Sequence, residues 1–111
     1  MIFTVGCTKP SKIVRIDSPT PGLFYTVETY DGRGPLASDF TRVYANLERG
    51  GRKETELVLD GEYLQVKDAV WTSPTDVVFR ISGNTNSYHN FVVLVSAKPS
   101  ITIHTSLRQE Q

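Results

Sequence analysis

Hydrophobic and polar residues alternate with a period of two along most of this chain. Leu23, Tyr25 and Val27 alternate with Thr26 and Glu28, and residues 43–47 follow the same rule. Such alternation is typical of a strand with one buried face. No stretch from residue 11 to residue 106 has helical spacing. We therefore predict an all-β, single-domain antiparallel meander that forms a small sandwich or partly open barrel, with about eight short strands. The expected strands cover residues 23–27, 43–47, 56–59, 62–66, 70–71, 77–81, 91–95 and 101–103.

Turn-forming residues separate these strands. Asp60-Gly61 stands between two expected strands, and this dipeptide favours the two-residue turn whose backbone needs positive φ. It predicts a hairpin, and Gly50-Gly51 predicts a second hairpin with a longer loop. Residues 91–95 would place apolar side chains on both faces of a strand, which favours a central position in a sheet. Residues 101–105 could form an exposed edge strand that pairs with a second copy.

One short phrase occurs twice in the chain. Ser18-Pro19-Thr20 returns 55 residues later as Ser73-Pro74-Thr75, with Phe24 and Phe79 at the same offset. The phrase resembles the blade repeat of TolB-like β-propellers. A closed propeller needs at least four blades of about 40 residues, which this chain cannot supply. Two blade-like meanders packed face to face, or two proline turns that each start a strand, remain as alternatives.

Charge and composition limit the classes of partner. The 111 residues include 12 Lys and Arg against 12 Asp and Glu. A nucleic-acid-binding surface or a polybasic membrane patch requires an excess of basic residues, so neither is expected. No stretch approaches the roughly 20 apolar residues of a membrane-spanning helix. A protein partner is the default that remains.

The single cysteine is the clearest sign of cellular setting. Cys7 follows Gly6 at the end of an apolar run and precedes a polar stretch with a proline. This arrangement resembles the end of a bacterial lipoprotein signal peptide. The resemblance implies lipidation of Cys7 and, because Thr8 stands where aspartate would signal retention, anchoring to the outer membrane on its periplasmic side. The alternative is a cytoplasmic protein in which residues 2–5 form an ordinary first strand.

The lipoprotein interpretation divides the chain into three parts. Residues 1–12 are expected to be a signal remnant and tether, residues 13–106 the all-β domain, and residues 107–111 a flexible tail.

The sequence contains no recognisable catalytic set. The two histidines, His89 and His104, lie in polar positions that suit surface or hydrogen-bonded side chains. No Gly-x-Ser-x-Gly elbow is present, and no Cys or His spacing suits a metal. We expect neither an enzyme nor a bound cofactor or metal. The alternative would require a cleft that gathers Asp39, Arg42 or His89.

Two loops carry the residue types that suit recognition. Residues 31–39 are long for a hairpin connection, and the loop of residues 83–89 is rich in small hydrogen-bonding residues with an aromatic tip. Ser82, Gly83 and Tyr88 are similar to the Ser-Gly-x-x-Tyr loop of periplasmic lysozyme inhibitors. The residues predicted to bind a partner are Arg33, Leu36, Asn84, Asn86, Tyr88 and His89.

Together these features predict a non-enzymatic periplasmic lipoprotein that binds another protein. The most concrete form is an immunity or inhibitor protein that neutralises a toxin or a cell-wall hydrolase. A structural accessory subunit of a cell-envelope assembly is the alternative. The oligomeric state is left open.

Overall fold

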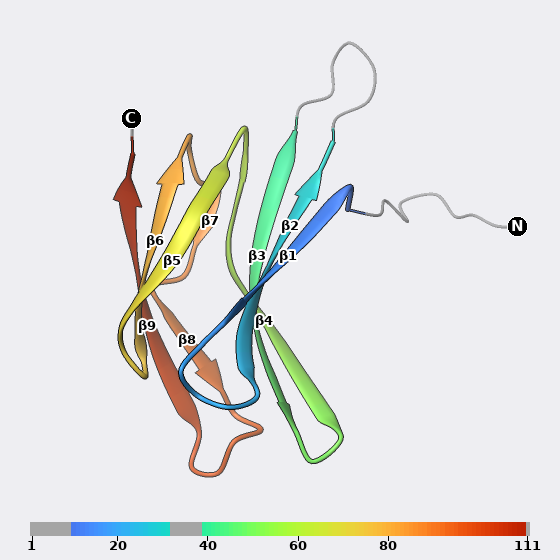
Figure 1. Cartoon of the computed structure of the whole chain (residues 1–111), viewed down its shortest axis with the longest axis vertical. Helices are drawn as coiled ribbons and strands as arrows, with labels where there is room; N and C mark the ends of the chain where they lie inside the picture. The colour runs from blue at the N-terminus through green and yellow to red at the C-terminus, as the bar shows by residue number, and fades with distance from the viewer. Residues whose placement is uncertain (1–9, 32–38, 111) are drawn as a thin grey trace, which may run out of the picture.

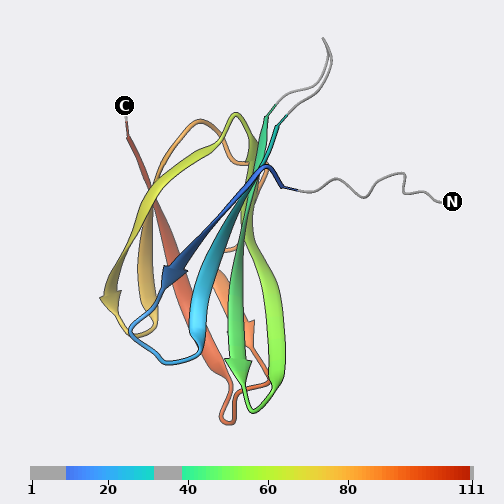
Figure 2. The ribbon, with the colours of Figure 1, turned by 45° about the vertical axis from the view of Figure 1, so that its right-hand side comes forward.

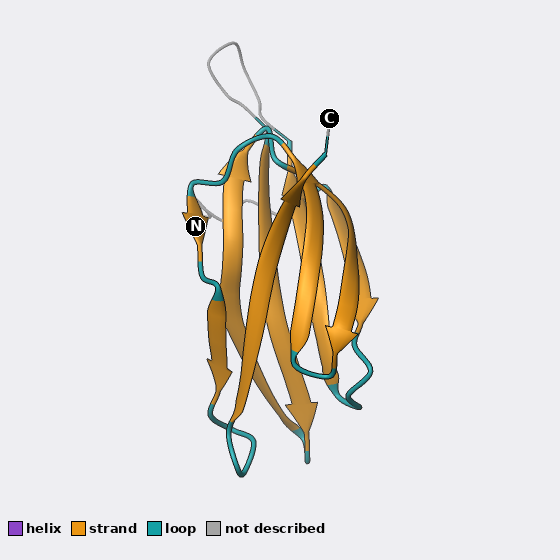
Figure 3. Cartoon of the chain, turned by 90° about the vertical axis from the view of Figure 1, so that its left-hand side faces the viewer, coloured by secondary structure: helices purple, strands orange, loops and turns teal. Residues whose placement is uncertain are grey.

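The strands form two sheets that face each other, as the computed structural model shows for residues 10–31 and 39–110 (Figure 1). Sheet A has the order β1 (Lys12–Asp17), β2 (Leu23–Tyr30), β3 (Phe40–Arg49), β4 (Arg52–Glu62) and β7 (Ser87–Tyr88). Sheet B has the order β5 (Gln65–Ser73), β6 (Asp76–Ser82), β9 (Ile101–Gln109) and β8 (Phe91–Leu94). The described residues contain no helix (Figure 3). The predicted all-β fold is confirmed as an open two-sheet sandwich.

The core lies between the sheets and follows the period-two alternation. Inward-facing residues of β2, β3 and β4 meet inward-facing residues of β6, β8 and β9. The Tyr25 ring stacks on Trp71 with centroids 5.4 Å apart and meets Phe79 edge-on at 4.9 Å. Burial of each large apolar side chain contributes about 1.5–3 kcal/mol. The buried set includes Leu23, Tyr25, Val27, Val43, Ala45, Leu47, Val58, Leu59, Val77, Phe79, Ile81, Val92, Leu94 and Ile103.

The two long sides of the sandwich differ (Figure 2). On one side the chain leaves sheet B after β6, pairs with β4 of sheet A as β7, and returns to sheet B as β8. This crossover, residues 83–90, joins the sheets. On the opposite side β1 and β5 are the edges of their sheets and do not pair with each other.

The hairpin predicted at Asp60-Gly61 is wrong. β4 continues through this dipeptide to Glu62, and the next strand belongs to the other sheet. Asp60 pairs with Arg42 of β3 and with Ser87 of β7, so the strand is held on both edges. These tertiary pairings outweigh the local preference of the dipeptide for a turn.

The hairpin at Gly50-Gly51 is confirmed, but its loop is short. Arg49 pairs with Arg52, which leaves only the two glycines in the turn. Their φ angles are 59° and 77°, the left-handed values that a tight hairpin turn requires. The longer loop that was expected is therefore absent at this position.

The predicted central position of residues 91–95 is also wrong. β8 is an edge strand, in which Phe91 and Val93 face outward while Val92 and Leu94 are buried. An apolar run alone does not distinguish a central strand from an edge strand with an exposed apolar face. β9 lies centrally between β6 and β8 instead of forming an edge.

The ends of the domain differ slightly from expectation. β9 continues to Gln109 because it pairs along β6, so residues 107–109 belong to the sheet and not to a tail. Lys12 is likewise part of β1 and not of a tether.

One strand pair departs from the antiparallel order. β6 and β9 are parallel, because the crossover carries the chain away from β6 and the later strand β9 fills the place beside it. Sheet B is therefore not a meander, which excludes two blade-like meanders.

The two Ser-Pro-Thr phrases are similar turns. Ser18 Oγ accepts a hydrogen bond from Thr20 N at 3.0 Å, and Ser73 Oγ accepts one from Thr75 N at 3.2 Å. The first turn joins β1 to β2, and the second joins β5 to β6. The interpretation as two proline turns that each start a strand is confirmed.

Candidate functional site

The flanks of the two predicted recognition loops meet at one end of the sandwich, the upper end in Figure 1. Tyr30 pairs with Phe40 beside the first loop, and Phe40 pairs with Glu62 of β4. The backbone of Asn84, in the second loop, lies directly against Gly61. We call this region the loop end and define it by Tyr30, Phe40, Arg42, Tyr63, Asn84 and Asn86. Arg33 and Leu36 lie outside the described residues, as does Cys7.

Tyr63 lies between the two loops, where the chain passes from sheet A to sheet B. Its φ of 56° is in the left-handed region, which costs a residue with a side chain about 1–2 kcal/mol. Tyr63 N donates to Asp39 O at 2.9 Å, and Gly83 packs against the Tyr63 carbonyl so closely that a Cβ would overlap it. The side chain is 68% exposed. The fold therefore holds an exposed aromatic ring in a strained backbone position.

Sequence reasoning missed Tyr63, which was assigned to an ordinary strand within residues 62–66. The only sequence signals are Gly61 and Gly83, and both gain their meaning from contacts across the fold.

An arginine and two aromatic rings flank the first loop on the outer face of sheet A. The Arg42 guanidinium lies 5.5 Å from the centroid of the Tyr30 ring and 5.1 Å from that of Phe40. The Tyr30 hydroxyl donates to Glu28 Oε1 at 2.5 Å, and burial together with this bond raises the pKa of Tyr30 to about 12. Tyr30 is thus a neutral hydrogen-bond donor at physiological pH. Tyrosine and arginine are the residue types that most often dominate protein interfaces.

The predicted residues of the second loop divide into two groups. Asn84, Asn86 and His89 have exposed side chains, with the two asparagines at the loop end. Asn86 N donates to Asp60 O at 2.7 Å, and His89 N donates to Val58 O at 2.8 Å. These backbone bonds fix the loop to β4.

Tyr88 has a structural contact as well as an exposed ring edge. Its hydroxyl donates to Thr105 O at 2.5 Å, which links β7 of sheet A to β9 of sheet B. Thr105 Oγ1 in turn donates to His89 O at 2.8 Å. Tyr88 therefore holds the crossover in place, in addition to its predicted contact with a partner.

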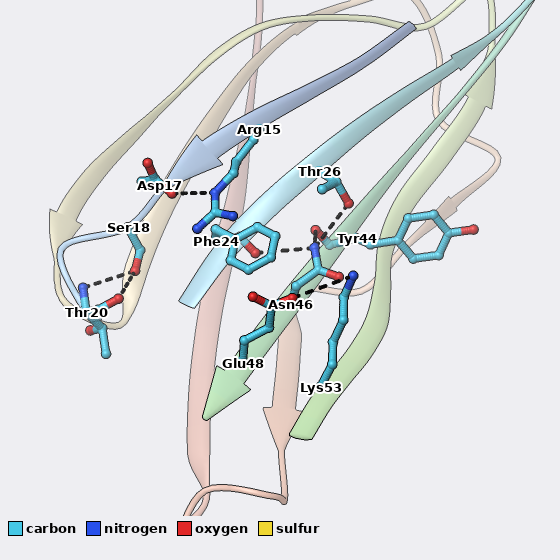
Figure 4. Close-up of polar contacts among 10 residues, drawn as sticks. All are labelled: Arg15, Asp17, Ser18, Thr20, Phe24, Thr26, Tyr44, Asn46, Glu48 and Lys53. Carbon is cyan, nitrogen blue, oxygen red and sulfur yellow. Dashed lines mark hydrogen bonds and ion pairs between the residues drawn. The ribbon is translucent and has the colours of Figure 1, made fainter. Parts of the chain in front are cut away.

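A buried polar network stiffens the outer face of sheet A (Figure 4). Asn46 is only 2% exposed, although it faces away from the core. Its Nδ2 donates to Thr26 Oγ1 at 3.1 Å and its Oδ1 accepts from Thr55 Oγ1 at 2.9 Å, which ties β2, β3 and β4 together. The Arg15 guanidinium covers the neighbouring Phe24 ring at 3.7 Å from its centroid.

A row of polar side chains on sheet B contains the residue types of a catalytic triad. Ser73 Oγ donates to Asp76 Oδ2 at 2.6 Å, and Asp76 Oδ1 lies 3.2 Å from His104 Nδ1. The Ser73 bond, and then the contact with His104, lower the pKa of Asp76. In a serine hydrolase the imidazole stands between serine and aspartate and takes the serine proton. Here the aspartate stands in the middle, so the row cannot activate Ser73 in that way.

Within residues 10–31 and 39–110, no three His, Cys, Asp or Glu side chains gather in a group that could hold a metal ion. The same ranges contain no helix with the length and apolar character needed to cross a membrane.

Comparisons with known proteins identify no relative. No family model matches the chain, and no curated protein or solved structure is significantly similar to it.

Proposed function

We propose that this chain is a binding domain that engages a protein partner through its loop end. The observation that carries the proposal is Tyr63, an exposed aromatic ring held in a left-handed conformation between the two loops. Strained backbone positions persist only where surrounding contacts impose them, and they concentrate at functional sites. Arg42, Tyr30 and the two exposed asparagines complete a surface with adaptable polar groups and rigid rings.

The proposal retains the setting predicted from the sequence. The chain is a periplasmic lipoprotein, anchored to the outer membrane through Cys7. Its most concrete role is that of an immunity or inhibitor protein that neutralises a toxin or a cell-wall hydrolase. Mass spectrometry of the product from its native cell tests the anchor, because a diacylglyceryl mass on Cys7 is either found or not.

Affinity capture from periplasmic extract tests partner binding. The wild-type domain serves as bait beside Tyr63→Asn, which tolerates the left-handed backbone but removes the ring, and Thr72→Asn, an exposed control on β5. We expect one protein that wild type and Thr72→Asn retain and that Tyr63→Asn binds at least about tenfold more weakly. Failure to retain any protein, or equal retention by all three baits, would overturn the proposal.

A further inference from the structure

A cleft opens on the side of the sandwich where β1 and β5 do not pair. Its volume is about 710 Å³, within the roughly 300–1,000 Å³ of small-molecule sites. Residues of β1, β2 and β5 line it, and Tyr63 and Asp39 lie at its upper end. The opposite side of the sandwich is bridged by the crossover, so the cleft faces the long side that the described residues leave open.

The inner part of the cleft is apolar. Its apolar lining consists of Val14, Ile16, Val27, Leu64, Val66 and Ala69. Val14 is 40% exposed although it is one of these lining residues, so the cleft leaves apolar surface in water. Ile16 pairs with Tyr25, and Trp71 lies two residues beyond Ala69, so the stacked Tyr25 and Trp71 rings stand below the cleft.

The mouth of the cleft carries two lysines from opposite walls. Lys12 comes from β1 and Lys67 from β5, and neither forms an ion pair with any residue that the structure describes. Asp68, beside Lys67, is bound by Arg80, whose Nε donates to Asp68 Oδ1 at 2.6 Å. Arg80 forms ion pairs with Asp68 and Glu110, and Arg108 forms one with Glu110, so these two arginines and two carboxylates are neutral together. Of the charged lining residues, Lys12 and Lys67 against Asp39 then leave a local charge of +2 − 1 = +1. This balance suits a ligand with one negative charge.

The edge of β5 argues against a peptide strand added to β5 as the occupant. The pairing of β5 with β6 shifts between Val66 and Asp68, in the part of β5 that lines the cleft. A bulge interrupts the regular spacing of N–H and C=O groups that strand addition requires. A ligand held by apolar contact and charge has no such requirement.

We propose that this cleft binds a free fatty acid, with its carboxylate between Lys12 and Lys67 and its unbranched chain along the apolar lining toward Trp71. The ligand removes the exposed face of Val14 from water and supplies the negative charge that the two lysines lack. This inference rests on Lys12, Lys67 and Val14, which do not belong to the loop end, although Tyr63 borders both sites.

Titration with dodecanoate, followed by the fluorescence of Trp71, tests the proposal, since Trp71 is the only tryptophan in the chain. We expect saturable binding that weakens with salt, because the lysines are exposed. The double variant Lys12→Glu/Lys67→Glu and the variant Val14→Glu should each weaken binding at least about tenfold. Ile13→Glu is the matched control, because Ile13 is the exposed neighbour on the outer face of the same strand, and it should change binding by less than about twofold.

Four results would overturn the proposal. The first is no saturable binding at about 1 mM dodecanoate, and the second is equal binding of dodecyltrimethylammonium, which has the same chain and the opposite charge. The third is a wild-type dimer that Val14→Glu dissociates, which would make the cleft a contact between copies. Sedimentation with anionic phospholipid vesicles is a separate arm, and binding to vesicles without binding to free dodecanoate would also contradict it.

Discussion

Gly61 of β4 and Asn84 of the crossover lie in direct contact, so a Cβ on Gly61 would overlap the Asn84 carbonyl and lie 3.1 Å from Thr85 Cα. The glycine that indicated a turn in the sequence is instead a site of close approach between two backbones. This contact brings the second recognition loop to the same end of the sandwich as the first. The position of the candidate site thus depends on a glycine at position 61, where any side chain would keep the two backbones apart.

Substitution of Gly61 should therefore be costly. We expect Gly61→Ala to lower the free energy of unfolding by about 3 kcal/mol, because the crossover has to move away from β4. Gly50→Ala is the control, since a Cβ there meets nothing within 4 Å and only the left-handed backbone opposes it, at about 1 kcal/mol. Urea unfolding of both variants measures the difference. Equal losses would show that the crossover adjusts freely.

Replacement of Tyr63 should separate stability from function. Tyr63→Gly relieves about 1–2 kcal/mol of left-handed strain and adds about 0.5–1 kcal/mol of chain entropy cost. We expect a net gain of about 0.5 kcal/mol in the free energy of unfolding, together with loss of partner binding. The comparison is Thr72→Gly, which lies in a regular strand and should lose stability. A Tyr63→Gly protein less stable than wild type would mean that the ring contributes to the fold.

The Asn46 network should be sensitive to truncation. Asn46→Ala removes the hydrogen-bond partner of the Thr26 and Thr55 hydroxyls in a buried part of the sheet. We therefore expect the free energy of unfolding to fall by about 2 kcal/mol. Thr55→Ala removes one bond from an exposed residue and should cost less, about 1 kcal/mol. Chemical denaturation gives both values. The order of the two losses is the decisive result, and a larger loss for Thr55→Ala would contradict the account.

Glu54 should link stability to pH. Hydrogen bonds from the Ser96 hydroxyl and N–H, and from Val95 N–H, lower the pKa of Glu54 below its ordinary value of 4.5. A carboxylate with a lowered pKa stabilises the fold above its unfolded pKa, and this contribution is lost as the pH falls through the folded pKa. We expect Glu54→Gln to be less stable than wild type at pH 7, with a difference that shrinks below about pH 4.5. Unfolding at both pH values measures this, and a difference independent of pH would refute it.

The sequence predicted which residues form strands more reliably than it predicted which strands lie side by side in a sheet. Alternation located β2, β3 and β6, because each has one face on the core. It could not place β8, because an apolar run looks the same at the centre of a sheet and at an edge whose outer face carries Phe91 and Val93.

The candidate site was predictable only in part. Loop composition indicated residues 83–89, and the structure places Asn84 and Asn86 at the loop end. Tyr63 could not be found in this way, since its conformation arises from contacts with Asp39 and Gly83 that are distant in the sequence.

Site-specific photo-crosslinking tests partner binding at the loop end most directly. A benzophenone side chain is placed at position 63, or at position 95 as the control. The native side chains at both positions are 68% exposed, and Val95 does not belong to the loop end. In the native cell, we predict a discrete cross-link to one protein from position 63 and none from position 95. No cross-link from position 63, or the same products from both positions, would contradict the account.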